Sequence, residues 1–247
     1  MTYRKSVDLE TTVEVWCANI KDFTFDDFFY RHEYMLGMDE LDRIGNFLLE
    51  KDRFVCLVSR VLLRLVLSWY SPCTCPSTWQ FSKNKYGKPY LNCDQFPGLE
   101  FNLTHSGDIV LCAFTRSGAV GIDIETAGLM KNVDAVVNRF FAAEEKDFFK
   151  TLADFEKNEF FFRLWTIKES YVKAIGAGMQ IPFDGFSIDA RSIATGPIKL
   201  CYEFDHTVRE WQFFQHTYSS DFYPVSIAVL TTRQLGLVWR DPSFLKL

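Results

Sequence analysis

The sequence predicts an α+β protein built from two similar halves. Alternating apolar and polar residues at 11–20 and 119–125 are typical of strands, and helical spacing followed by further strands comes after each of them. The same order of elements therefore occurs twice within 247 residues, a length that allows one large domain or two small ones. The Arg-Ser-Gly turn at 116–118 is the expected boundary, giving halves of 1–118 and 119–247.

The first half is expected to open with a strand at 11–20 and to continue through three helices. Phenylalanines at positions 25, 28 and 29 indicate the first helix, and acidic residues open the second at 38–44, where the helix dipole favours them. The apolar spacing over 50–69 predicts a long core helix. Its arginines are expected in solvent, with contact to an anionic ligand as the alternative: Arg53, Arg60 and Arg64.

A hairpin and three strands should complete this part of the chain. Gly87 and Pro89 favour a turn within 80–92, and its lysines (Lys83, Lys85 and Lys88) suit either a solubilising tip or phosphate binding. Strands are expected at 99–105, 109–114 and 119–125. This run should bring His105 and Asp123 to neighbouring strands, at the same edge of the sheet.

The strand at 121–125, GIDIE, carries the most unusual pattern. A period of two buries Ile122 and Ile124 and places Asp123 and Glu125 together on the opposite face. Two like charges on one face repel, so the pair costs stability unless a cation lies between them. Carboxylates on a rigid strand suit Mg²⁺. A solvated acidic edge strand is the alternative that this stretch leaves open.

The second half is expected to hold helices at 133–141, 143–152 and 158–174 and strands at 183–189, 198–205, 209–217 and 225–231. Gly176 and Gly178 should end the third helix. On that helix Glu169 and Lys173 lie four residues apart, opposite the main apolar stripe. They form either an ordinary surface pair or, because Phe162 and Trp165 make that side apolar, part of a cleft between the halves.

Composition narrows the class of protein. A net charge of −5 argues against a nucleic-acid binder that relies on bulk positive charge. The N-terminus has no apolar core of a secretory signal, and the longest apolar stretch is interrupted by arginines, so no membrane association is expected. Seven irregularly spaced cysteines indicate reduced thiols rather than disulfides. A cytoplasmic location follows.

Five motifs occur in an order that resembles a known family. They are GKP at 87–89, FNLTHS at 101–106, GIDIE at 121–125, RFF followed by Glu145, and WTIKES-YVKA at 165–174. Together with DRIGNF at 42–47 they resemble the 4′-phosphopantetheinyl transferases. The resemblance is to the long, pseudo-dimeric type that activates peptide synthetases, especially its animal members, and it covers roughly 39–186.

The resemblance implies a fold and an activity. The two halves should be related by a pseudo-two-fold, with the active site in the cleft between them. The activity would be that of a holo-[acyl-carrier-protein] synthase: transfer of 4′-phosphopantetheine from coenzyme A to a serine of an apo acyl or peptidyl carrier protein, releasing 3′,5′-ADP. Coenzyme A would be the co-substrate, Mg²⁺ the cofactor with Mn²⁺ as the alternative, and the protein a monomer.

Roles for individual residues also follow from the resemblance. Asp123, Glu125 and Glu169 would hold the metal, Glu169 would also take the serine proton, and Lys173 would assist the leaving group, so the catalytic residues would be Glu169, Lys173 and Asp123. His105 would bind a phosphate of the nucleotide. Thr104 replaces the usual Ser, and Lys83 stands where Arg is frequent, which loses bidentate phosphate binding. The expected coenzyme A contacts are Arg43, Lys83, Lys85, Lys88, Asn102, Thr104, His105, Asp123, Glu169 and Lys173.

Two other functions remain open at this point. A carrier-binding module without catalysis would be marked by a broken acidic set or a missing Lys173, and neither is seen. Another Mg²⁺-dependent phosphate-ester transferase on the same scaffold would act on ATP without coenzyme A. Carrier proteins are acidic around their serine, so a chain of charge −5 needs a local basic or apolar docking face.

Overall fold

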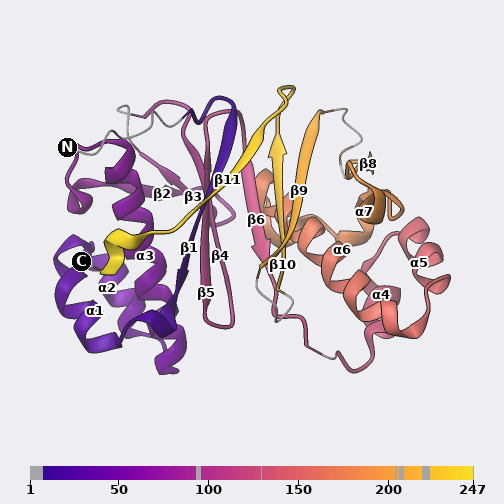
Figure 1. Cartoon of the computed structure of the whole chain (residues 1–247), viewed down its shortest axis with the longest axis horizontal. Helices are drawn as coiled ribbons and strands as arrows, with labels where there is room; N and C mark the ends of the chain where they lie inside the picture. The colour runs from indigo at the N-terminus through magenta and orange to yellow at the C-terminus, as the bar shows by residue number, and fades with distance from the viewer. Residues whose placement is uncertain are drawn as a thin grey trace.

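Two sheets lie side by side at the centre of the molecule, and helices cover their outer sides (Figure 1). The computed structural model describes residues 8–92, 96–128, 130–203, 205, 209–218 and 223–246, without the side chains of Met179 and Lys246. Helices α1 to α3, within residues 25–70, flank one sheet, and α4 to α7, within residues 133–195, flank the other (Figure 1). This arrangement is the α+β class that the sequence predicts.

The first half follows the expected order closely. The long helix α3 packs its apolar side on a sheet of order β11-β1-β5-β4, and together they form one hydrophobic core. The elements are β1 (Thr12–Asn19), α1 (Phe25–His32), α2 (Met38–Gly45), α3 (Glu50–Tyr70), β2 (Phe81–Lys83), β3 (Pro89–Leu91), β4 (Glu100–Ser106) and β5 (Ile109–Thr115).

The second half is built around helix α6, which packs on the sheet β6-β10-β9. This helix begins at Asp154, four residues before the expected start, because Glu156 accepts the backbone N–H of Ala153 in a capping box. The strands expected at 183–189 and 198–205 shorten to β7 and β8. The elements are β6 (Val120–Ile124), α4 (Val133–Phe140), α5 (Ala143–Lys150), α6 (Asp154–Ile175), β7 (Ser187–Ile188), α7 (Ser192–Thr195), β8 (Leu200–Tyr202), β9 (Trp211–Tyr218), β10 (Tyr223–Leu230) and β11 (Gly236–Arg240).

The two halves share one topology. Each has a first strand, then a long helix, then a hairpin whose second strand pairs antiparallel with the first strand. In the first half these are β1, α3 and β4–β5, and in the second they are β6, α6 and β9–β10. The order of elements that recurs along the sequence is therefore also a repeat of the chain path.

The last strand returns to the first half. β11 pairs in parallel with β1, and Figure 1 shows it crossing from the second half toward the C-terminus on the side of α1. Arg240 binds the buried Glu14 at 2.6 Å, and Glu14 also accepts the Tyr70 hydroxyl at 2.9 Å. The sequence analysis did not predict β11 and placed all of 119–247 in the second half. The pairing of β11 depends on a distant strand, so local patterning could not reveal it.

The arginine of α3 nearest its C-terminus is not solvated as expected. Arg64 is 4% exposed and forms a buried ion pair with Glu40 of α2 at 2.7 Å. It also donates to the carbonyls of Pro76 and Trp79, so it joins α3 to the loop that precedes β2. Both expectations for Arg64, solvent and an anionic ligand, are wrong: the side chain is part of the core.

The described cysteines are all free, as the sequence indicates. These are Cys17, Cys56, Cys73, Cys75, Cys112 and Cys201. The seventh, Cys93, lies outside the described residues.

Buried His32 should make the protein sensitive to acid. Neither ring nitrogen makes a hydrogen bond of good geometry within the described residues. Burial together with nearby Arg31 lowers the pKa of the imidazole, and the Leu245 backbone opposes this shift. The unfolded chain, with a His pKa of about 6.5, therefore binds the proton more readily, so the free energy of unfolding falls as the pH drops below about 6.5. His32→Phe should flatten this fall, which urea unfolding at several pH values would measure. The matched control variant is His216→Phe, a change at an exposed histidine. An unchanged slope in His32→Phe would contradict the assignment.

Candidate active site

The site forms where β6 meets helix α6. Gly121 of β6 lies so close to this helix that a Cβ atom there would stand 2.0 Å from the Ser170 carbonyl oxygen and 2.4 Å from the Ala174 nitrogen. Only glycine allows this approach. The contact brings Glu169 and Lys173 of α6 next to Asp123 of β6, and so joins the two acidic motifs of the sequence.

Strand β4 of the first half runs along the other side of β6. The Asn102 side chain accepts the backbone N–H of Ile122 at 2.9 Å, and further along Ser106 accepts the N–H of Thr126 at 2.9 Å. These bonds hold the two strands in the same direction across the boundary between the sheets. The Asn102 side chain therefore joins the two halves. His105 on β4 and Asp123 on β6 lie on neighbouring strands, as expected.

Asp123 is buried, so the solvated acidic strand is ruled out. Its side chain is 6% exposed, and Oδ1 accepts Lys173 Nζ at 2.5 Å and Thr104 Oγ1 at 3.3 Å. Lys173 Nζ also donates to Thr104 Oγ1 at 3.1 Å. Burial raises the pKa of Asp123, and the Lys173 ammonium opposes that rise. The pair contains one residue from each acidic motif.

The second oxygen of Asp123 supports a cation site. Oδ2 is buried and has no hydrogen-bond partner within the described part of the chain. Burial and the nearby Asp123 charge raise the pKa of Glu125 to about 7, and the same causes raise the pKa of Glu169. An unpaired oxygen and mutually repelling carboxylates fit a divalent cation. Across the described residues, however, no three acidic, His or Cys side chains are already gathered around one point.

A pocket of about 330 Å³ opens beside these residues, between the hairpin β2–β3 and the last turns of α6. Both halves contribute to it, and its polar side chains are Tyr86, Lys88, Asn102, Glu169 and Lys173. The rest of its wall includes the backbone at Gly87 and the apolar side chains of Pro89 and Phe183. The cleft between the halves that the sequence predicts is therefore present. It contains expected coenzyme A contacts of the first half, Lys88 and Asn102, and the expected catalytic residues Glu169 and Lys173 of the second.

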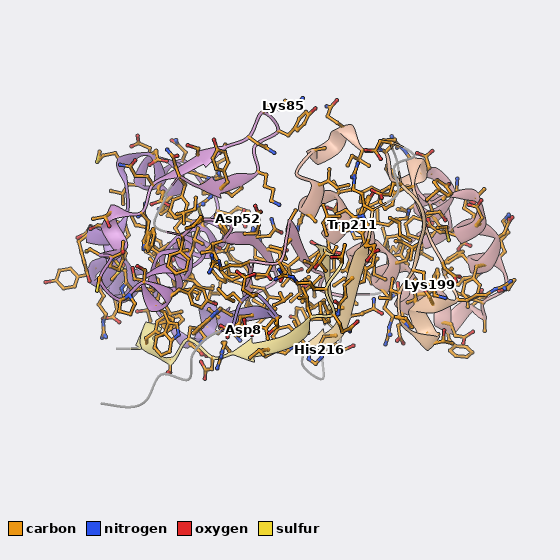
Figure 2. The ribbon with its side chains drawn as sticks, turned by 90° about the horizontal axis from the view of Figure 1, so that it is seen from above. Asp8, Asp52, Lys85, Lys199, Trp211 and His216 are labelled. Atoms are coloured by element: carbon orange, nitrogen blue, oxygen red, sulfur yellow. The ribbon has the colours of Figure 1, made fainter. Side chains whose placement is uncertain are left out.

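The other expected coenzyme A contacts lie in different settings. Lys83 and Lys85 are exposed, and Figure 2 shows Lys85 at the outer end of its hairpin, where its ammonium lies 4.6 Å from the Tyr86 ring centre. Arg43 is exposed on α2 and does not line the pocket. His105 stays exposed on β4, and desolvation together with the Lys173 charge lowers the pKa of its imidazole.

Sequence reasoning missed a buried ion pair beneath the site. Lys168 and Glu145 are both 0% exposed and 2.8 Å apart. Lys168 Nζ also donates to the carbonyls of Phe183 and Phe186, and Glu145 accepts the N–H groups of Ala142 and Ile188. The lysine directly before Glu169 is thus structural. The sequence did contain a signal for this pair. Lys168 and Glu169 are adjacent on an apolar helix, and adjacent side chains point in different directions, so one of the two charges had to face the core.

Comparisons with known proteins decide the family. A model of the 4′-phosphopantetheinyl transferase superfamily matches residues 119–228, and a model of the N-terminal region of 4′-phosphopantetheinyl transferases matches 26–117. The 4′-phosphopantetheinyl transferase gsp of Aneurinibacillus migulanus is 34% identical over 171 residues, 66% of this chain and 69% of the relative. The chain belongs to the 4′-phosphopantetheinyl transferase superfamily.

Two further relatives show how far the similarity extends. The 4′-phosphopantetheinyl transferase HetI of Nostoc is 36% identical over 58% of this chain and 61% of the relative. The L-aminoadipate-semialdehyde dehydrogenase-phosphopantetheinyl transferase of Mus musculus is 27% identical over 69% of this chain and 58% of the relative. The resemblance read from the motifs is confirmed. None of the described helices has the length and apolar character needed to span a membrane.

Proposed function

We propose that this protein transfers 4′-phosphopantetheine from coenzyme A to a serine of an apo acyl or peptidyl carrier protein, with 3′,5′-ADP as the leaving product. The observation that carries the proposal is the buried Asp123 carboxylate, with one oxygen on Lys173 and the other unpaired, beside a pocket formed by both halves. Such a site suits a reaction that depends on charge neutralisation and positioning.

The metal fits the acidic side of this site. Asp123 Oδ2, with Glu125 and Glu169 nearby, would hold Mg²⁺ or Mn²⁺. When bound, the ion would neutralise charge on the pyrophosphate of coenzyme A. We propose Asp123 as the ligand on which the site depends most, because its buried oxygen has no other partner.

The protein's own residues supply the proton transfers and the positioning. Burial raises the pKa of Glu169, which suits this carboxylate to act as a base. Glu169 would accept the proton of the carrier serine while the serine hydroxyl oxygen attacks the phosphorus that carries pantetheine. The bond to the adenosine-side phosphate would then break. Lys173 neutralises Asp123 in the ligand-free site, and on leaving that carboxylate it would donate to the leaving phosphate oxygen.

The remaining contacts would select coenzyme A. His105, Lys83 and Lys85 are exposed donors near the pocket side of the first half, suited to nucleotide phosphates, and Arg43 would reach the ligand from α2. The monomeric state, the cytoplasmic location and the choice of carrier stay predictions.

Mass spectrometry of an apo carrier protein tests the function. Incubation with this protein, coenzyme A and Mg²⁺ should add one phosphopantetheine group to the carrier and release 3′,5′-ADP. A carrier whose acceptor serine is alanine should gain nothing, and a chelator should prevent the transfer. Mixtures with ATP in place of coenzyme A test the alternative transferase. Absence of the added group on several acyl and peptidyl carriers would contradict the proposal.

A further inference from the structure

The ammonium of Lys88 is bound to the backbone of the two elements that carry the site. Nζ donates to the carbonyl oxygen of Val120 at 3.1 Å and to that of Ala174 at 2.9 Å. Val120 opens β6, three residues before Asp123, and Ala174 follows Lys173 directly on α6. One side chain of the first half thus links both site elements of the second half.

The hairpin that carries Lys88 is held in place by a separate set of bonds. Asn84 Nδ2 donates to the Gly176 carbonyl at 2.7 Å, while its Oδ1 accepts the N–H groups of Tyr86 and Lys88, both at 2.9 Å. A Cβ on Gly176 would stand 2.8 Å from Lys88 Cδ, so the lysine stem packs directly on the helix end. None of these contacts uses the Lys88 ammonium, so we expect the hairpin to stay docked when the ammonium is removed.

The setting of this ammonium differs from that of a phosphate-binding charge. Burial lowers the pKa of Lys88, with Glu100 opposing the change, whereas Lys83 and Lys85 on the same hairpin are exposed. Two of its three N–H donors are used by carbonyls, and a carbonyl near a helix C-terminus is a favourable partner for a cation. The exposed lysines are better suited to attract the nucleotide.

We propose that Lys88 is a positioning residue, whose ammonium holds β6 with Asp123 at a set separation from α6 with Glu169 and Lys173. This role differs from the direct coenzyme A contact that the family resemblance implies for Lys88. Its catalytic consequence rests on the proposed function. Its structural consequence, a link between β6 and α6, does not.

Steady-state kinetics of Lys88→Met test the catalytic consequence, with Lys83→Met and Lys85→Met as matched controls. Loss of the link should lower kcat at least about tenfold and change the KM for coenzyme A less than about threefold, because misplaced reacting groups slow chemistry more than binding. The dependence of this KM on salt should stay as in the wild type. The two control variants should have a higher KM for coenzyme A than the wild type and an unchanged kcat. Their KM should also depend less on the salt concentration. The inference is overturned if Lys88→Met behaves as the controls do.

Hydrogen exchange of the ligand-free protein tests the link without any activity. Amides of 120–124 and 172–176 should exchange about tenfold faster in Lys88→Met than in Lys85→Met, as expected for the loss of hydrogen bonds to a charged group. Equal exchange in the two variants would also overturn the inference. If the wild type transfers nothing to any carrier, the proposed function fails while this measurement still decides the link. If Lys88→Met does not fold, Lys88→Gln undergoes the same two measurements with the same criteria, because its side chain is one atom too short to place an N–H at the position of Nζ.

Discussion

The Asp123→Asn variant should lose at least about a thousandfold in kcat/KM for transfer to a carrier protein. Asparagine keeps the shape of the side chain and an acceptor for Thr104, but it removes the charge that holds Lys173 and the anionic oxygen proposed to bind the metal. The loss should persist at saturating coenzyme A, because the missing group acts on the charge that develops during transfer. Initial rates over a range of coenzyme A and Mg²⁺ concentrations measure it.

The fold should survive this substitution. The substitution leaves Lys173 without its ion pair, but this side chain is 28% exposed and keeps Thr104 as a hydrogen-bond partner. No fully buried charge is left unpaired, so the free energy of unfolding should change by less than about 1 kcal/mol. Glu159→Gln removes an acidic side chain from an exposed ion pair on α6 and should leave the rate unchanged. Near-wild-type transfer by Asp123→Asn would rule out Asp123 as the main metal ligand.

The Lys168→Met variant should lose about 3–5 kcal/mol of stability, since it leaves Glu145 as an unpaired charge in the core. For a chain of this size such a loss lowers the midpoint of thermal unfolding by about 10 °C. Lys168 also donates to the carbonyls of Phe183 and Phe186, and these would lose their donor. Calorimetry or urea unfolding measures the change.

A surface ion pair provides the comparison. Lys150→Met breaks the exposed pair with Asp147, which has the same N–O distance of 2.8 Å, and should cost less than about 1 kcal/mol. The double variant Lys168→Met with Glu145→Gln should recover part of the loss, because it removes the unpaired charge. The single amide oxygen of glutamine can keep only one of the N–H groups that Ala142 and Ile188 donate to separate oxygens of Glu145. Equal losses in Lys168→Met and Lys150→Met would contradict the burial argument.

Local patterning predicted the elements that neighbours along the chain determine. Helices α2 to α5 and strands β1, β4, β5 and β6 begin and end within about two residues of the expected positions, because their apolar periods and turn residues act over one or two turns. The conspicuous charges in the motifs also pointed to the pocket: Asp123, Glu169 and Lys173 lie together. The early start of α6 was missed although its capping signal at Glu156 is local, whereas β11 and Arg64 were missed because a distant segment decides the outcome.

The sequence by itself determined the family, the α+β class and the acidic strand on which the site is built. Only the tertiary structure decided which charges are available for chemistry. Asp123, Lys88 and Lys168 are all charged residues within recognisable motifs, yet one has an unpaired oxygen, one is bound to two carbonyls, and one is enclosed in the core. The physical reason is that desolvation and hydrogen-bond partners set the role of a charge, and both come from residues far away in the chain.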